Sequence, residues 1–205
     1  MIAGVILAGG RAVRMGGGDK ALLRLAGQPL LAHVIGRFAP QVAQLAINAN
    51  GDPTRFQAFG LPVIADTIEG HAGPLAGILA GLHWAAGIAG VTHLATVAVD
   101  TPFLPRDLVA RLAASPGSAD RIVLAASAGK THPVAGLWPL SVTGALRMFL
   151  AAGETRKVTV FTGRMEAGIV DFAAPNGGTR SADPFFNVNT PDDLAGAEQF
   201  LGGID

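Results

Sequence analysis

Short apolar runs alternate along this chain with longer segments whose apolar residues recur every three or four positions. The first pattern is typical of buried strands, and the second is typical of helices with one apolar face. We expect strands at 2–8, 45–48, 63–65, 94–99, 122–126, 134–138 and 169–172, and helices at 29–38, 105–112, 141–151 and 191–201, with a further helix starting at Leu75. Because strands and helices alternate, the pattern predicts a Rossmann-like, three-layer αβα domain of the α/β class, with a mostly parallel sheet.

Polar residues stand at the ends of three of these expected strands. They are Asn48, Asp66 and Asp100. In open α/β sheets ligands bind beyond the carboxyl ends of the strands. We therefore expect the three side chains to lie at one ligand-binding edge.

The first strand leads into a glycine-rich loop. Five glycines lie between Leu7 and Lys20, together with the cation Arg14. Glycines let backbone N–H groups approach phosphate oxygens, and Arg14 and Lys20 would offset phosphate charge, so the loop predicts a triphosphate cradle. Lys20 follows Asp19 and precedes Ala21, so the loop is not of the GxxxxGK[ST] type, and it contains no GxGxxG. The alternative is a surface turn with solvated charges.

Composition limits the classes of partner. Fifteen Lys and Arg balance fifteen Asp and Glu, so no global field attracts nucleic acid or an anionic membrane. The absence of cysteine excludes disulfides, thiolate nucleophiles and zinc-thiolate sites. Residues 72–99 carry no Asp, Glu, Lys or Arg, but Pro74 and several glycines interrupt them and they divide into a helix and a strand, so we expect no membrane span. Met1 leads directly into the first strand, which favours a cytoplasmic protein.

Asp100 is the strongest candidate for chemistry. A carboxylate at the end of a buried strand is held rigidly, and a hard cation that bridges phosphate oxygens needs only one or two protein ligands. We therefore expect Asp100 to bind Mg²⁺; its alternative role is to cap the following helix. Gly73 and Gly77 flank the start of the helix at Leu75, where free N–H groups could hold an anion or the glycines could allow close packing.

Two asparagines near the end of the chain are further candidates. Asn187 and Asn189 flank Val188, and on a strand both amides would project from the same face. They either contact a ligand or cap the last helix. Thr190 and Asp193 have the spacing of a capping box for that helix.

Several blocks of sequence resemble the molybdenum cofactor guanylyltransferases, a family within the nucleotidyltransferase superfamily. The signature blocks are Leu7-Ala8-Gly9-Gly10, Arg14-Met15-Gly16 and Lys20. Further blocks follow in the family's order at 45–52, 66–67, 73–77, 100–103, 132–133 and 186–191. The resemblance therefore covers nearly the whole chain, and it favours a helix rather than a strand at 154–165.

The resemblance implies a Mg²⁺-dependent enzyme that transfers GMP from GTP to the phosphate of molybdopterin and releases pyrophosphate. It implies catalytic roles for Arg14, Lys20 and Asp100, with Asp100 as the metal ligand. The implied nucleotide-binding positions are Leu7, Ala8, Gly9, Gly10, Lys20, Asn48 and Asp66, with Gly73 and Gly77 as further binding candidates. It also implies that Asn187 and Asn189 line the site of the pterin acceptor.

We expect one nucleotidyltransferase domain, with a nucleotide-binding half at about 1–104 and an acceptor-binding half at about 105–205. The expected partners are GTP and molybdopterin or molybdenum cofactor, and a molybdoenzyme chaperone or another protein of cofactor biosynthesis is a further candidate. Two alternatives stay open. One is a related nucleotidyltransferase that uses CTP or a sugar-phosphate acceptor, which Gly9-Gly10 disfavours because the cytidylyl relatives typically have LAAG at this place. The other is a nucleotide-binding module without catalysis, which the presence of both Lys20 and Asp100 disfavours.

Overall fold

The computed structural model describes residues 1–9, 19–68, 73–153, 155–172 and 183–202. These residues form a seven-stranded sheet with the strand order β5-β4-β1-β6-β8-β7-β9 and a separate two-stranded ribbon, β2-β3. The strands are β1 (Ile2–Leu7), β2 (Arg24–Leu25), β3 (Gln28–Pro29), β4 (Gln44–Asn48), β5 (Val63–Ile64), β6 (His93–Ala98), β7 (Val123–Ser127), β8 (Lys130–Pro139) and β9 (Gly168–Asp171). The α-helices are α1 (Leu30–Phe38), α2 (Pro74–Ala86), α3 (Leu108–Ala113), α4 (Thr143–Ala152), α5 (Val158–Arg164) and α6 (Pro191–Gly202). Short 3-10 helices lie at Lys20–Leu22, Ala39–Gln41, Pro53–Phe59 and Leu140–Val142.

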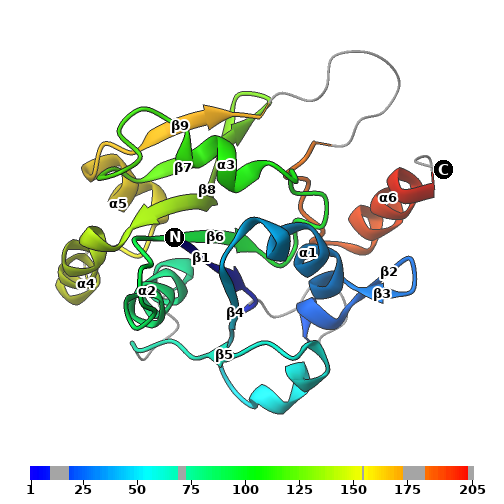
Figure 1. Ribbon diagram of the computed structural model, residues 1–205. Helices are drawn as coiled ribbons and strands as arrows, with labels where there is room; N and C mark the ends of the chain where they lie inside the picture. Colours follow the sequence, from blue (N-terminus) through cyan, green and yellow to red (C-terminus); the bar gives the residue numbers. More distant parts are fainter. Residues whose placement is uncertain (10–18, 69–72, 154, 173–182, 203–205) are drawn as a thin grey trace.

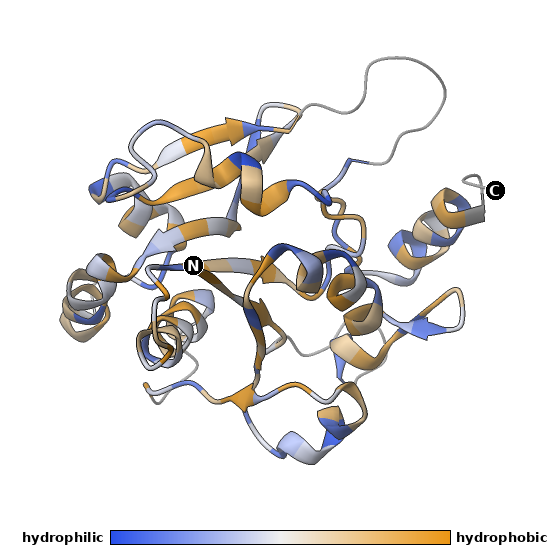
Figure 2. Ribbon diagram, viewed as in Figure 1, coloured by the Kyte–Doolittle hydropathy of each residue, from blue (hydrophilic) through white to orange (hydrophobic). Residues whose placement is uncertain are grey.

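Helices cover both faces of the sheet and give the molecule three layers (Figure 1). The core on one face includes α1 and α3, and the core on the other face includes α2, α4 and α5. Neighbouring residues of β1 serve opposite faces, since Val5 packs with α2 and Ile6 packs with α1. Figure 2 shows β1 and β4 coloured as apolar over most of their length, as expected for strands buried on both faces. The predicted three-layer α/β fold is confirmed. Within the described ranges, no helix combines the length and apolarity that crossing a bilayer requires.

The central strand β1 is parallel to both of its neighbours. Leu7 is in register with Asn48 of β4 on one side and with Ala98 of β6 on the other. β5 is parallel to β4, and β9 is parallel to β7. Because β4, β1 and β6 run in one direction and end together, the residues that follow them meet at one edge of the sheet.

β8 is the exception, because it runs antiparallel to both β6 and β7. It follows β7 through the two-residue turn Ala128-Gly129, in which both residues have positive φ (47° and 74°). Positive φ at both central positions gives the tight hairpin turn that suits the twist of antiparallel strands. An Ala-Gly pair lacks the usual Asn-Gly signal of such a turn, and the sequence prediction of a strand at 134–138 misses the first half of β8.

The last described part of the chain crosses back over the carboxyl edge of the sheet. Residues 183–189, here called the arm, precede α6. The Val188 N–H donates to the Asp100 carbonyl oxygen (2.9 Å), and the Val188 side chain is fully buried beside Phe103. The capping box is confirmed: Asp193 Oδ2 accepts from Thr190 N (2.9 Å), and Thr190 Oγ1 accepts from Asp193 N (3.1 Å).

Two sequence predictions of secondary structure are wrong. Residues 187–189 do not form a strand, because the Val188 N–H bonds to the residue after β6 rather than to a strand partner. The helix predicted at 105–112 begins only at Leu108, where the Gln41 side chain accepts from Val109 N (2.9 Å) and donates to the Pro105 carbonyl (2.9 Å). The helix preferred for 154–165 is confirmed as α5.

A polar cluster fastens the arm to the β7–β8 hairpin. Ser127 Oγ lies 2.7 Å from His132 Nε2 and donates to Asp183 Oδ1 (2.6 Å). The His132 ring stacks on Phe185 at 4.4 Å between centroids. Since Ser127 uses its one proton toward Asp183, it accepts from His132 Nε2–H.

The stability of the protein should depend on the ionisation of His132. Burial lowers the pKa of His132 below its ordinary 6.5, Asp183 opposes this shift, and Lys130 adds to it. The unfolded chain therefore takes up this proton at a higher pH than the folded chain. The contribution of neutral His132 to the free energy of unfolding is therefore fully present above about pH 6.5. It is lost as the pH falls through the lowered pKa that His132 has in the folded protein. Urea unfolding of the wild type should show this loss, and His132→Gln should lack it. An identical pH dependence in the two proteins would contradict the assignment.

Candidate active site

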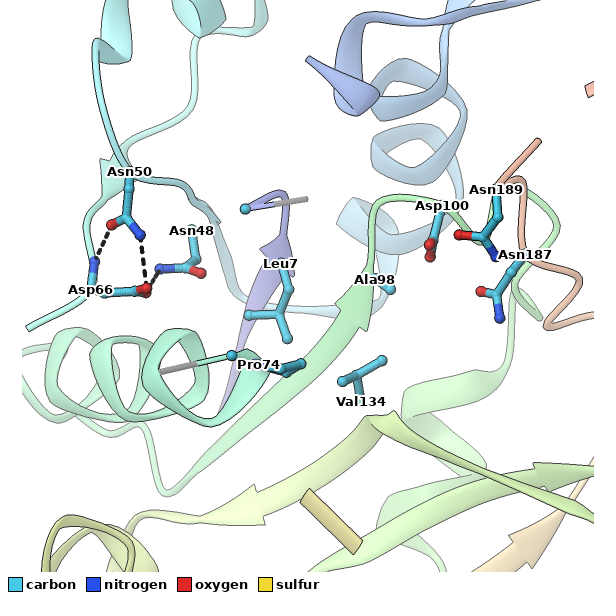
Figure 3. Close-up of a pocket in the computed structure, with 12 residues that line it drawn as sticks. Leu7, Asn48, Asn50, Asp66, Pro74, Ala98, Asp100, Val134, Asn187 and Asn189 are labelled. Carbon is cyan, nitrogen blue, oxygen red and sulfur yellow. Dashed lines mark hydrogen bonds between the residues drawn. The ribbon is translucent and has the colours of Figure 1, made fainter. Parts of the chain in front are cut away.

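A cavity of about 530 Å³ opens at the edge where β1, β4 and β6 end. Figure 3 shows two polar groups of side chains with apolar residues between them. One polar end is made of Asn48, Asn50 and Asp66, and the other of Asp100, Asn187 and Asn189. The apolar floor between them is made of Leu7, Pro74, Ala98 and Val134, and Gly9 and Gly73 also line the cavity. A pocket of this size with polar groups at both ends suits an elongated small molecule.

At the first polar end, hydrogen bonds fix the Asp66 carboxylate. Asn48 Nδ2 donates to Asp66 Oδ1 (2.9 Å) and Asn50 Nδ2 donates to Asp66 Oδ2 (2.8 Å). Asn50 Oδ1 in turn accepts from the Asp66 backbone N–H (2.9 Å). A carboxylate has about four acceptor positions, so both oxygens keep the capacity to accept from a ligand. The carboxylate is thus a rigid acceptor pair for adjacent N–H groups.

The backbone of α2 approaches the Asn48 amide closely at Gly77. A Cβ at this position would lie 2.2 Å from Asn48 Oδ1 and 2.9 Å from Leu7 Cδ2. Of the two roles considered for Gly77, the structure therefore supports close packing. Gly73, with φ of 67°, lines the cavity just before α2 begins at Pro74.

At the second polar end, Lys20 joins three segments of the chain. Its Nζ donates to Asp100 Oδ2 (2.6 Å) and to Asn189 Oδ1 (2.5 Å). The Lys20 side chain is 10% exposed and that of Asp100 is 20% exposed, so the ion pair is largely shielded from water. An ammonium carries three N–H bonds, and these two contacts leave one to donate to a phosphate oxygen.

The arm places the two asparagines beside this ion pair. Asn187 and Asn189 both line the cavity, as predicted, although the segment is not a strand. Asp193 holds the end of the arm, since its Oδ2 accepts from Asn189 N (2.9 Å). This backbone hydrogen bond, with help from Thr190, keeps the pKa of Asp193 below its ordinary value despite some desolvation. The carboxylate therefore stays ionised at neutral pH.

Most of the predicted site residues meet in this one cavity. Those that line it are Leu7, Gly9, Asn48, Asp66, Gly73, Asp100, Asn187 and Asn189. Ala8 is buried in the core and shapes the site through its N–H, which donates to the Asn48 carbonyl (2.8 Å). Gly10 and Arg14 lie outside the described residues, so their roles stay predictions.

The sequence prediction missed three residues with a part in the site. Asn50 holds Asp66, and its signal was its place two residues after Asn48 in the same strand-end block. Val134 lines the floor of the cavity; it begins the strand predicted at 134–138, but an apolar strand residue carries no signal of a binding role. Arg55 contacts Asp19 and Asn50 through bonds that no local pattern indicates.

The side chains at the Asp100 end of the cavity limit which metal ion could bind there. No group of three or more His, Cys, Asp or Glu side chains in the described part of the chain is placed to hold a metal ion. Asp100 instead offers a single carboxylate at an open cavity. This set does not fit a metal enclosed by protein ligands, but it fits Mg²⁺, which takes one or two carboxylates and completes its shell with substrate phosphates and water.

The architecture and the site together define a protein of the nucleotidyltransferase class. The Asn48–Asn50–Asp66 network and Asp100, paired with Lys20, lie at opposite ends of one cavity, beyond the carboxyl ends of parallel strands. The chain belongs to the family described as the MobA-like NTP transferase domain, whose model matches residues 4–165.

Relatives extend this match over the whole chain. The molybdenum cofactor guanylyltransferase of Mesorhizobium japonicum is 52% identical, over 98% of this chain and 96% of its own length. The protein of the same name from a Bradyrhizobium species is also 52% identical, over 100% of this chain and 95% of its own. The crystal structure of molybdopterin-guanine dinucleotide biosynthesis protein A from Archaeoglobus fulgidus has the same fold, with a TM-score of 0.74, 24% identity and coverage of 99% of this chain and 100% of that one.

Gly77→Ala should weaken nucleotide binding. The added Cβ would push the Asn48 amide away from Asp66, and losing one well-placed hydrogen bond corresponds to about a tenfold loss of affinity. Calorimetric titration with GTP measures this. Gly36→Ala is the matched control, because it lies within α1 where a Cβ meets nothing within 4 Å, and it should keep full affinity. Wild-type affinity in Gly77→Ala would show that the close approach does not position Asn48.

Proposed function

We propose that this chain transfers GMP from GTP to the phosphate of molybdopterin, in its metal-free or molybdenum-bound form, and releases pyrophosphate. The observation that carries the proposal is a single cavity with the Asp66 network at one end and the Lys20–Asp100 pair at the other. Relatives named molybdenum cofactor guanylyltransferase at 52% identity over nearly the whole chain support the choice of substrates.

The Asp66 end suits guanine. The ring N–H and the exocyclic amine of guanine stand side by side, so a carboxylate can accept from both. Cytosine places an amine beside an unprotonated ring nitrogen and offers no such donor pair. Because Asn48 and Asn50 fix the orientation of Asp66 before any ligand arrives, little ordering is left for the binding step.

The Lys20 end suits the triphosphate. The free N–H bond of Lys20 can donate to a phosphate oxygen, and further phosphate contacts would replace those to Asp100 and Asn189. Arg14, six residues before Lys20 in the sequence, is the expected second cation. The cations would neutralise the charge that develops as pyrophosphate leaves.

Asp100 is the residue that would hold Mg²⁺. When bound there, the ion would supply charge neutralisation and orientation of the phosphates. A phosphate ligand that draws Lys20 toward itself frees Asp100 Oδ2 for this role. The ion pair between Lys20 and Asp100 would thus separate when the triphosphate and Mg²⁺ bind.

The reaction needs positioning more than proton transfer. A phosphate oxygen of molybdopterin attacks the α-phosphorus of GTP, a new phosphoanhydride bond forms, and the bond to the β-phosphate oxygen breaks. Pyrophosphate leaves with that bonding pair, and the nucleophile is already an anion, so no strong general base is required. Holding both polyanions in line supplies most of the rate enhancement.

The acceptor would lie beside the arm. Asn187 and Asn189 offer amides toward a pterin, and Val134 and Ala98 offer an apolar floor between the two ends. This placement fits the expected division of one domain into a nucleotide-binding half and an acceptor-binding half. A cytoplasmic location and transfer of the product to a molybdoenzyme chaperone belong to the same proposal.

Turnover with radiolabelled nucleotides tests the proposal. The purified protein with Mg²⁺, molybdopterin and GTP labelled at the α-phosphate should place the label in a molybdopterin dinucleotide and release one pyrophosphate per transfer. Labelled CTP should give at least about a hundredfold less product, since a site built for a donor pair discriminates strongly against a base that lacks it. Preferential labelling from CTP would make the chain a cytidylyltransferase, and GTP binding without any product would make it a binding module.

Asp100→Asn should reduce this turnover by about 10²- to 10³-fold, the usual effect of removing one electrostatic group from a transfer site. The amide keeps the shape of the side chain and loses its charge. Asp107→Asn is the matched control, because Asp107 is exposed at the start of α3 and makes no side-chain cap bond. Turnover of Asp100→Asn within about twofold of the control would remove Asp100 from the reaction.

A further inference from the structure

Hydrogen bonds from Arg55 connect the segment that carries Lys20 to the segment that carries Asn50. Arg55 Nε donates to Asp19 Oδ2 (2.6 Å), and Arg55 Nη2 donates to the Asn50 carbonyl (2.7 Å). Arg55 Nη1 donates to the Asp52 carbonyl (2.5 Å). We call these three bonds the Arg55 bridge. It spans from the residue before Lys20 to the strand-end block that holds Asp66.

Each end of the bridge acts on a residue of the site. Asp19 caps the short helix that carries Lys20, because its Oδ1 accepts from Ala21 N (3.0 Å). Asn50 holds Asp66 through its side-chain amide and carbonyl. A displacement of Arg55 therefore moves the phosphate cation relative to the base acceptor.

From this geometry we infer that Arg55 is a positioning residue, which fixes the separation of the base and phosphate ends so that the two parts of GTP bind as one ligand. The inference rests on the proposed function, because it names GTP as the molecule that spans the cavity. All three nitrogen atoms of the Arg55 guanidinium donate to protein oxygens. It therefore acts through Asp19 and Asn50 rather than on the nucleotide.

The chemistry of arginine suits this role. A planar guanidinium directs several N–H groups at fixed angles, whereas a lysine ammonium is one point with a flexible stem. The Arg55 guanidinium also lies over the ring of the fully buried Phe56 at 4.5 Å, which restricts its plane. The Arg55 and Asp19 side chains are 26% and 18% exposed, so the bond between them is partly shielded from water.

A bridge between two binding ends has a distinct energetic signature. Linking two contacts correctly makes the second contact intramolecular, so the whole ligand binds far more tightly than its parts suggest. Loosening the Arg55 bridge should leave the affinities for the separate base and phosphate parts unchanged and should weaken only the affinity for the whole nucleotide. A residue that merely stabilises the fold would not separate these quantities.

Titrations with GTP, guanosine and pyrophosphate therefore test the role of Arg55. In Arg55→Gln, affinity for GTP should fall about tenfold or more, while affinities for guanosine and for pyrophosphate stay within about twofold of wild type. Arg55→Lys should behave like Arg55→Gln, because one ammonium cannot reach all three acceptors. Asp19→Asn should also weaken GTP binding, and adding it to Arg55→Gln should cause little further loss.

Arg111→Gln is the matched control. Arg111 also donates to a carbonyl, that of Asp171 (2.7 Å), and lies over a buried ring, that of Phe172 at 4.0 Å, but it is on α3 away from the cavity. It should lower the melting temperature and leave GTP affinity unchanged.

Three results would overturn the inference: an equal loss of affinity for GTP, guanosine and pyrophosphate in Arg55→Gln, full GTP affinity in Arg55→Lys, or a matching loss in Arg111→Gln. A wild-type protein with no preference for GTP would instead contradict the proposed function.

Discussion

The contact on which the site depends is the bond from Lys20 Nζ to Asp100 Oδ2. It joins the segment that follows the glycine-rich loop to the end of β6, and the second bond from Nζ, to Asn189, adds the arm. The two side chains are largely shielded from water and satisfy each other's charge. The same pairing keeps both groups where a triphosphate and a cation would need them. The site is therefore held together by the charges that the proposed reaction would use.

The sheet determines where these groups can meet. Leu7, Asn48 and Ala98 are in register across three parallel strands, so the chain leaves the sheet three times at one edge. Asn48 ends β4 and Asp66 follows β5, Lys20 lies on the segment that comes after β1, and Asp100 follows β6. β8 runs in the opposite direction and brings Val134 under the same cavity. The arm closes the arrangement, fixed by Val188 to the Asp100 carbonyl and by the Ser127–His132–Asp183 cluster to the hairpin.

Strand ends were predictable because apolar runs followed by a polar residue leave few choices in an α/β sheet, and this placed Asn48, Asp66 and Asp100 correctly. The turn of the β7–β8 hairpin could not be predicted from the sequence. Ala128 takes a positive φ there, and alanine is not a residue that indicates such a turn. Asn187 and Asn189 were correctly predicted to lie at the site, although they do not lie on a strand. The hydrogen bond from Val188 N–H to the Asp100 carbonyl holds this part of the arm beside the cavity. In the Arg55 bridge, the guanidinium bonds to a side chain 36 positions away and to a backbone carbonyl 5 positions away, and no periodicity in the sequence indicates such contacts.

The central claim is that Lys20 exchanges its contact with Asp100 for a contact with a phosphate oxygen. A crystal structure of the protein with GTP bound tests this claim most directly. Lys20 Nζ should then donate to a phosphate oxygen at about 2.7–3.2 Å, with the bond to Asp100 Oδ2 broken and guanine against the Asp66 carboxylate. Lys20 still bound to both Asp100 and Asn189, with the triphosphate held elsewhere, would contradict this description of the site.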